Sequence, residues 1–356
     1  MSASGFIKRL LGRGASDRDG TGASSTLLTT QPMPRAAGTP LDDYELGEEI
    51  GRGAMAVVNK AVDRRSGALV AIKRLALQRE FSPEDLVDVR DRFMREAGAA
   101  RHLEHPDILR VLDAGESAGD TWIAMELVVG QDLSHHTRAG QLLPLREVLL
   151  IGARLARALQ YAHDHGVVHR DIKPANVMLE RASGSVKIMD FGIARVADSS
   201  RTRTGLVLGT PSYMSPEQLA GLQVDGRTDL YSLGVMLFQL LTGNLPHQSE
   251  SMAKLMQQIA IQPAPDLRQL RAELPESLAL VIALALEKRP ELRYQRGDVL
   301  AQDLEAVLSQ LPAELANSTG ATPPPPAGQA FEQTLRLQSK GAVHNPLPPD
   351  DPPRDT

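Results

Sequence analysis

The alternation of apolar and polar residues divides the chain into a strand-rich part and a helical part that follows it. Short apolar or alternating runs predict strands at 56–62, 70–73, 121–127 and 186–189. Apolar residues spaced three and four positions apart predict helices within 83–103 and 145–165. Two more apolar runs are too short for a bilayer, which needs about 20 residues, and we expect buried helices at 233–241 and 278–286.

Composition separates one folded region from two tails. The first 40 residues are rich in Gly, Ser, Thr and Pro, and the segment 311–356 carries Pro323 to Pro326 and further prolines. Neither composition supports a packed core, so we expect both segments to be disordered. The Pro-rich segment favours an extended conformation, which serves either as a plain tail or as a docking segment for a partner. The folded domain is expected at 41–310, strand-rich at 41–127 and helical at 128–310.

Charge and cysteine content narrow the function classes. The chain has 356 residues and a formal net charge of −5, which argues against nucleic acid as its main partner. It contains no cysteine, which excludes disulfides and cysteine-ligated metal sites and fits a reducing compartment. We recognise no secretory signal and no run long enough to span a membrane. We therefore expect a cytoplasmic protein without a transmembrane segment.

One short segment combines a base, a cation and a metal ligand. It reads His-Arg-Asp-Ile-Lys-Pro-Ala-Asn from His169 to Asn176. Asp171 can accept a hydroxyl proton, Lys173 can neutralise charge on a phosphate, and Asn176 offers a carbonyl oxygen to a hard cation. The segment matches the protein kinase catalytic loop residue for residue, so the chain resembles a bacterial Hanks-type (eukaryotic-like) Ser/Thr protein kinase. This resemblance implies an α+β fold of two lobes, the first small and strand-rich, the second larger and helical.

A second kinase motif follows the strand predicted at 186–189. Asp190-Phe191-Gly192 alone fits any junction of strand and turn, but its position after the catalytic loop favours the kinase magnesium motif. In that motif Asp190 coordinates the ions that bridge the phosphates of ATP, while Phe191 packs inward. The implied cofactors are ATP and Mg²⁺, with Mn²⁺ as an alternative ion.

The segment from Ile50 to Val58 resembles the kinase glycine-rich loop, although Ala56 replaces its third glycine. In isolation two glycines at this spacing predict only a hairpin turn. A strand-like run follows them, which argues against a dinucleotide-binding fold because that motif opens a helix. Ala56 removes some backbone freedom near the phosphates but adds no bulky side chain that would block the site. The resemblance implies contacts with ATP from Ile50, Gly51, Arg52, Gly53 and Val58.

The resemblance also identifies a lysine and its helix partner. Lys73 ends an apolar strand and would hold the α- and β-phosphates, although a lysine that closes an edge strand is the simpler alternative. Glu96 would pair with Lys73 from the helix at 83–103, although a helix glutamate is usually just solvated. Met125 would lie behind the adenine. Further contacts with ATP are implied for Ala71, Glu126, Val128, Asp132 and Met178, and Asp132 equally fits an N-cap.

The segment 190–217 resembles a kinase activation loop. Thr202 and Thr204 lie where related kinases autophosphorylate, and Arg170 would bind the new phosphate, although exposed loops commonly carry threonines. Lys173 and Thr210 resemble the Ser/Thr-specific pattern, in which Thr210 hydrogen-bonds the base and the lysine.

Two carboxylates, Glu217 and Asp229, are implied as structural anchors. Ser-Pro-Glu, which ends at Glu217, replaces the usual Ala-Pro-Glu, and Arg293 stands where the family places the partner of this glutamate. Asp229 would anchor the backbone of the catalytic loop from a buried helix. Either residue is alternatively a solvated surface charge.

Three histidines gather around the predicted end of the helix at 145–165. His163, His165 and His169 suggest a metal site, but no acidic pair completes one, and His169 has a packing role in the family. We therefore expect His163 and His165 to cap or flank the helix end.

Together these motifs predict a Ser/Thr protein kinase that transfers the γ-phosphate of ATP to protein hydroxyls and phosphorylates itself. One alternative is a catalytically silent kinase fold that serves as a scaffold, which only Ala56 supports. Another is a small-molecule phosphotransferase, which Arg170 and the threonine-bearing loop argue against.

Overall fold

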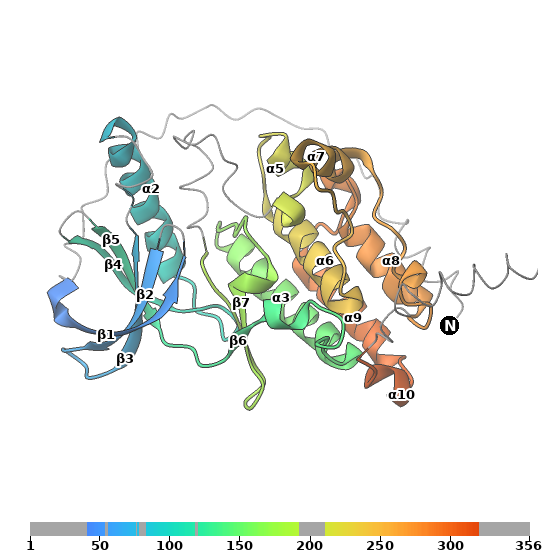
Figure 1. Ribbon diagram of the computed structural model, residues 1–356, viewed down its shortest axis with the longest axis horizontal. Coiled ribbons are helices and arrows are strands. Elements are labelled where there is room, and N and C mark those ends of the chain that lie inside the picture. The colour runs from blue at the N-terminus through green and yellow to red at the C-terminus, as the bar shows by residue number, and fades with distance from the viewer. Residues whose placement is uncertain are drawn as a thin grey trace, which may run out of the picture. The chain divides into compact units, whose positions relative to one another are not determined.

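The computed structural model describes residues 41–53, 56–75, 77, 83–117, 120–191 and 211–319. The first part of the described chain is a strand-rich lobe with one long helix, and the rest is mainly helical (Figure 1). Thr202, Thr204, Thr210, Gly192 and most of the predicted tails lie outside the described residues. The strand-rich first part and the helical second part expected from the sequence are confirmed.

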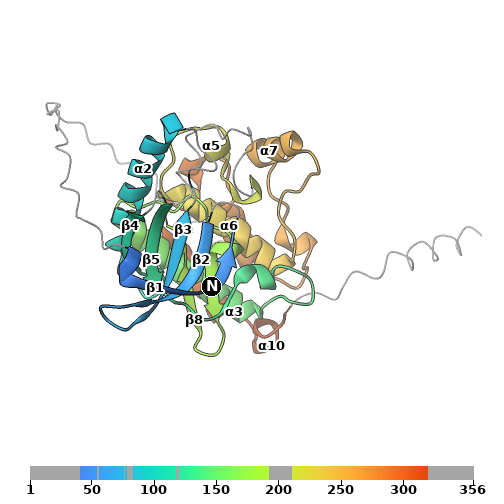
Figure 2. The same cartoon turned by 60° about the vertical axis from the view of Figure 1, so that its left-hand side comes forward.

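The described N-terminal lobe contains an antiparallel five-stranded sheet in the order β1-β2-β3-β5-β4. After the short 3₁₀ helix η1 (Leu41–Asp43), its strands are β1 (Tyr44–Arg52), β2 (Ala56–Asp63), β3 (Leu69–Leu75), β4 (Val111–Ser117) and β5 (Asp120–Glu126). The helix α2 (Pro83–Arg101) lies along one side of this sheet (Figure 2).

Both faces of the sheet are packed. The stripe predicted for α2 is confirmed, because Val89, Phe93 and Ala97 are buried against Leu75 and Ile123 of the sheet. Strand alternation places Lys73 on this same face. The opposite face forms a second apolar cluster around Trp122, and a Cβ added at Gly115 would lie 2.7 Å from the indole ring. Apolar packing on both faces therefore holds β3, the strand that carries Lys73, in place.

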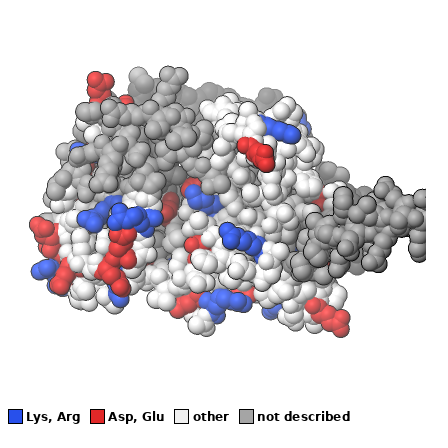
Figure 3. Space-filling model, in the orientation of Figure 1, with Lys and Arg blue, Asp and Glu red and all other residues white. Residues whose placement is uncertain are grey.

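Ion pairs lie on the solvent-exposed surface of β1 and β2. Glu45, Glu48 and Glu49 of β1 pair with nearby arginine and lysine side chains. Figure 3 shows acidic and basic side chains next to each other over this lobe.

The C-terminal lobe has a small sheet and a helical core. The sheet consists of β6 (Gln131–Asp132), β7 (Val177–Glu180) and β8 (Ser185–Ile188). The helices are α3 (Leu145–Asp164), α5 (Pro216–Leu219), α6 (Gly226–Thr242), α7 (Met252–Ile261), α8 (Glu276–Ala285), α9 (Gly297–Ser309) and α10 (Ala313–Ala316). Short 3₁₀ helices are η3 (Leu133–His136), η4 (Pro174–Asn176), η5 (Pro211–Tyr213), η6 (Leu267–Gln269) and η7 (Pro290–Leu292).

The helix α3 is the centre of this lobe, packed on α6 and α9. Its predicted apolar stripe is buried, and so are nearly all side chains of α6. At the contact with α9, a Cβ on Gly297 would lie 2.2 Å from the carbonyl oxygen of Ala156. Past the predicted limit at residue 310, the amide of Leu145 donates to the carbonyl of Ser318. In the described part of the chain, no helix is long and apolar enough to cross a bilayer.

Candidate active site

The connection between α3 and β7 holds together two predicted catalytic side chains and one predicted metal ligand. Lys173 Nζ donates to Asp171 Oδ2 at 2.7 Å. Asn176 Nδ2 donates to the same oxygen at 2.9 Å and to the main-chain oxygen of Asp171 at 2.7 Å. Two donors therefore hold the Asp171 carboxylate in one orientation. Since Asn176 turns its NH₂ group toward Asp171, its carbonyl oxygen faces the other way.

The backbone of this loop is anchored on a buried carboxylate. Asp229 of α6 is fully buried and accepts the amide of His169 at 2.8 Å and the amide of Arg170 at 2.7 Å. It also bonds His163 Nε2 at 2.8 Å. Burial raises the pKa of Asp229, but the hydrogen bonds and the nearby histidines outweigh it and hold the pKa below its usual range. Asp229 is thus kept as a charged acceptor.

Two residues of the site adopt a left-handed backbone that is rare for side chains other than glycine. Arg170 has φ +69° and Asp190 has φ +61°, and in the described chain they alone among non-glycine residues have positive φ. Such conformations persist where surrounding contacts fix them, and they cluster at functional sites. The site's hydrogen bonds supply these contacts.

His169 joins the catalytic loop to the segment that carries Asp190. Its Nδ1 accepts the amide of Asp171 at 3.2 Å, so the proton lies on Nε2, which donates to the carbonyl of Met189 at 2.7 Å. The ring also meets Phe191 edge-on, with centroids 4.7 Å apart. These contacts fix Asp190 relative to Asp171.

Asp190 faces the N-terminal lobe. Lys73 Nζ donates to Asp190 Oδ1 at 2.7 Å, and both side chains are largely shielded from solvent. The main-chain amide of Met189 donates to the main-chain carbonyl of Asn176 at 2.9 Å, which places Asn176 close to Asp190, the residue after Met189. A carboxylate and an amide carbonyl are hard oxygen donors of the kind that Mg²⁺ prefers alongside phosphate oxygens. The donor set therefore fits the predicted ion.

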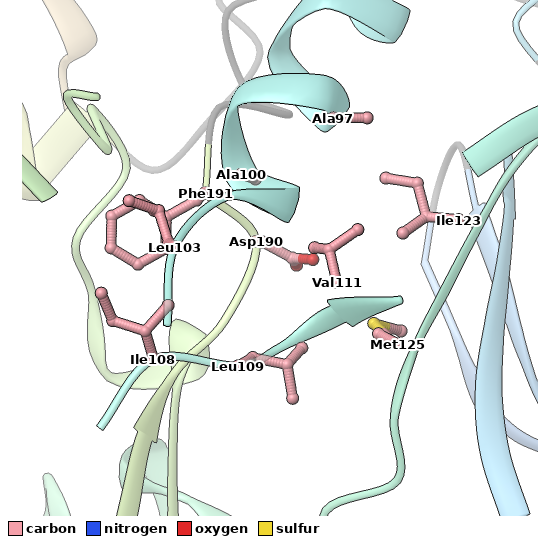
Figure 4. Close-up of a pocket in the computed structure, with 10 residues that line it drawn as sticks. All are labelled: Ala97, Ala100, Leu103, Ile108, Leu109, Val111, Ile123, Met125, Asp190 and Phe191. Carbon is pink, nitrogen blue, oxygen red and sulfur yellow. The ribbon is translucent and has the colours of Figure 1, made fainter. Parts of the chain in front are cut away.

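An apolar cavity lies behind Asp190 (Figure 4). Phe191 points toward Leu103 and Ile108, while the carboxylate of Asp190 is directed toward Val111. The cavity is also lined by Ala97, Ala100, Leu109, Ile123 and Met125.

Glu96 lies on α2 just before Ala97, which lines the cavity, and is half-buried. The ion pair described above joins Lys73 to Asp190, and the predicted pair of Lys73 with Glu96 stays a prediction.

Several residues predicted to contact adenine form one cluster. Val58, Val128 and Met189 pack against the buried Ala71 and Met125. Met178 lies on β7, opposite Asp132 in register, and is half-buried. The backbone of Glu126 ends β5 beside this cluster. Contact of these residues with ATP stays a prediction.

The glycine-rich segment links β1 to β2. Gly51 pairs with Val58 in register, and the amide of Gly53 donates to the carbonyl of Ala56 at 2.8 Å. Arg52 pairs with Glu49, and Ile50 is exposed. Ala56 packs against the apolar cluster that α2 forms with the sheet around Phe93.

Asp132 caps a helix. Its carboxylate accepts the amide of Ser134 at 2.9 Å as the N-cap of η3. This is one of the two roles that its position in the sequence allowed, and the contact with ribose stays a prediction.

A buried ion pair stabilises the end of the activation segment. Arg293 donates to both carboxylate oxygens of Glu217, at 2.6 and 2.7 Å, and its guanidinium stacks over Tyr231. Burial raises the pKa of Glu217, but Arg293 outweighs it, so the pKa is lowered. Gln218 completes a capping box with Ser215 and donates to the carbonyl of Arg170 at 2.8 Å. The segment is thereby bound to the catalytic loop.

Sequence reasoning missed two contacts of the site. Gln218 was detectable, because Ser215-x-x-Gln218 is a capping-box pattern. His163 was expected to flank the end of α3, and no local pattern pointed to its bond with Asp229. His165 does end α3 as its C-cap.

Comparison with known proteins agrees with this geometry. The family model described as protein kinase domain matches residues 44–304. A probable serine/threonine-protein kinase of Streptomyces coelicolor is 42% identical over 287 residues, which is 78% of this chain and 42% of that protein. The serine/threonine-protein kinase PknB of Mycobacterium leprae is 41% identical over 280 residues, 77% of this chain and 44% of its own.

The chain thus spans less than half the length of these relatives. Among solved structures, the PknI kinase domain of Mycobacterium tuberculosis is 34% identical and matches with a TM-score of 0.61. That match covers 76% of this chain and 99% of the PknI chain. The family match and the fold agree, and the chain belongs to the protein kinase family.

Proposed function

We propose that this protein is a Ser/Thr protein kinase that transfers the γ-phosphate of ATP to hydroxyl groups of protein substrates. The observation that carries the proposal is one connected set of hydrogen bonds. It links Asp171, Lys173 and Asn176 and reaches the amide of Met189 through the main-chain carbonyl of Asn176. The next residue along the chain, Asp190, then binds Lys73. A base, two cations and two oxygen ligands are the groups that phosphoryl transfer needs.

Each side chain has a role that follows from its position. Asp171 orients the acceptor hydroxyl and takes its proton, while Lys173 neutralises charge beside it. Lys73 reaches across from β3 and positions the phosphates. Asn176 and Asp190 would hold Mg²⁺, which when bound neutralises charge on the phosphate oxygens. Positioning and electrostatics then supply most of the rate enhancement.

Ser/Thr specificity and autophosphorylation are the finer parts of the proposal. The relatives are named serine/threonine-protein kinases, and Lys173 is in place beside the base. Asp229 and Gln218 hold the main-chain amide and carbonyl of Arg170, and its guanidinium is proposed to bind a phosphate on Thr202 or Thr204. Mass spectrometry of protein incubated with ATP, beside an Asp190→Asn control, tests this. Absence of phosphate at both threonines in active protein would contradict it.

A transfer assay tests the main proposal. Protein incubated with γ-labelled ATP and a generic basic protein is expected to label serine and threonine, as phosphoamino-acid analysis would show. Label on aminoglycosides or small alcohols instead would indicate a small-molecule phosphotransferase. Nucleotide binding without transfer to any acceptor would indicate a scaffold. Docking as one of the two alternatives for the Pro-rich segment stays a prediction, and so does the cytoplasmic location.

A further inference from the structure

Arg154 of α3 binds two segments outside its own helix. Its Nε donates to both carboxylate oxygens of Asp107 at 3.2 Å, and Nη2 donates to the same carboxylate. Its Nη1 donates to the carbonyl of Gly184 at 2.6 Å. The Asp107 side chain is only 8% exposed. None of these three residues belongs to the predicted active site, so their contacts have no role in the mechanism above.

Asp107 is bonded through its backbone to the strand that leads to Asp190. The amide of Ile188 donates to the carbonyl of Asp107 at 2.8 Å, and the amide of Leu109 donates to the carbonyl of Ile188 at 2.8 Å. Ile108 and Ile188 form a parallel bridge. Ile188 ends β8, two residues before Asp190, so the connection from α2 to β4 runs beside the approach to the metal ligand.

Gly184 lies in the turn just before β8 begins. This glycine has φ +69°, and its amide closes the turn by donating to the carbonyl of Glu180. Arg154 therefore holds β8 at both ends, at its start through Gly184 and at its end through Asp107. One guanidinium group makes both sets of hydrogen bonds, and its planar arrangement of N–H donors allows it to bind several acceptors at once.

Loss of this guanidinium would leave a nearly buried carboxylate without its partner. Such a charge is relieved by movement toward water, and a shift of the Asp107 main chain in that direction would disturb its bond to Ile188. The disturbance would reach Asp190, whose φ of +61° depends on its surroundings. Replacing a residue that hydrogen-bonds a metal ligand directly commonly changes metal affinity by about 10- to 100-fold. Arg154 acts on Asp190 through Asp107 and β8, so we expect an effect at the lower end of this range.

We propose that Arg154 is a positioning residue that sets the place of Asp190 for Mg²⁺, through Asp107 and β8. This inference rests on the proposed function only for the identity of the ion. It predicts that Arg154 controls the requirement for Mg²⁺ and leaves the affinity for nucleotide without metal unchanged.

The test compares Arg154→Met with a matched control on the same helix. Arg157 lies one turn along α3 and pairs with Glu305 on the surface, where both side chains are more than 40% exposed. Binding of ATP is titrated at increasing Mg²⁺ and again in chelator. Arg154→Met is expected to raise the Mg²⁺ concentration for half-maximal binding about tenfold. Arg157→Met is expected to match wild type, and binding in chelator should be equal for all three proteins.

Amide hydrogen exchange supplies a readout that needs neither activity nor metal. The peptide spanning 184–191 is expected to exchange faster in Arg154→Met than in wild type or Arg157→Met. Arg154→Lys is the second variant in case Arg154→Met does not fold. Its ammonium keeps the charge near Asp107 but loses the fork, so a smaller rise in the Mg²⁺ requirement is expected.

A wild-type Mg²⁺ requirement in folded Arg154→Met, or in Arg154→Lys where only that variant folds, would overturn the proposal. An equal shift in Arg157→Met would overturn it too, because the effect would then be general to α3. Wild-type protein that binds ATP with Mg²⁺ but labels no acceptor would refute the proposed function and leave this test intact.

Discussion

Replacing Arg293 with methionine is expected to destabilise the C-terminal lobe strongly. The guanidinium is fully buried and the Glu217 side chain is only 8% exposed, so the variant leaves an uncompensated carboxylate in the interior. Breaking a buried ion pair in this way costs about 3–5 kcal/mol. Domains have a free energy of unfolding of about 5–15 kcal/mol, so the loss is a large share of the total.

Urea unfolding followed by circular dichroism measures this loss. Arg157→Met is the matched control, because its exposed pair with Glu305 should contribute less than about 1 kcal/mol. The double variant Arg293→Met with Glu217→Leu is expected to recover part of the loss, since no buried charge remains. The recovery is incomplete, because Arg293 also donates to the carbonyls of Glu287 and Lys288. Arg293→Met as stable as Arg157→Met would refute the reasoning.

The same ion pair predicts a pH dependence. The pKa of folded Glu217 is lowered, so its charge stabilises the fold above the unfolded pKa of about 4.3, and this contribution is lost as the pH falls through the folded pKa. The stability of wild type relative to Glu217→Gln should therefore shrink below about pH 4. A difference that stays constant down to pH 3 would contradict this, because it would show that folding does not lower the pKa of Glu217.

The remaining predictions concern the site and its support. Lys73→Met is expected to lower the rate of phosphoryl transfer about 100- to 1,000-fold in a protein that still folds, and a wild-type rate would contradict its role. Gly226→Ala would place a Cβ 2.4 Å from the ring of His163, so a loss of about 1–3 kcal/mol is expected in urea unfolding, and unchanged stability would show that the ring moves freely. In Gly297→Ala the new Cβ would clash with the main-chain carbonyl of Ala156 rather than with a side-chain ring, so the urea midpoint of unfolding is expected to fall further than in Gly226→Ala. A larger fall in Gly226→Ala would contradict this.

Local patterns in the sequence predicted the elements well. The stripe on α2 and the stripe on α3 are both buried, because a spacing of three and four residues places side chains on one helix face. The two apolar runs expected to be buried helices lie within α6 and α8. α6 is buried nearly throughout, whereas α8 buries Leu278, Val281, Ile282 and Ala285 and leaves Leu280 exposed. Position within a motif also placed Asp171 beside Lys173 and Asn176, since these residues are only a few positions apart.

Contacts between distant segments were not predictable in this way. Periodicity shows that Arg154 and His163 lie on α3, but it does not show that they meet Asp107 and Asp229. Those partners depend on how α3 packs against α6 and β8, which local sequence does not specify. Asp132 shows a related limit, because one residue type fits both an N-cap and a ligand contact.

The most direct test of the account is the rate of phosphoryl transfer by Asp171→Asn at saturating Mg²⁺ and ATP, measured with ATP binding on the same preparation. Asparagine keeps the shape of the side chain but removes the base. We expect ATP affinity equal to that of wild type and a transfer rate to protein serine and threonine lower by about 100- to 10,000-fold. A wild-type rate in this variant would contradict the account, as would a wild-type protein that transfers no phosphate.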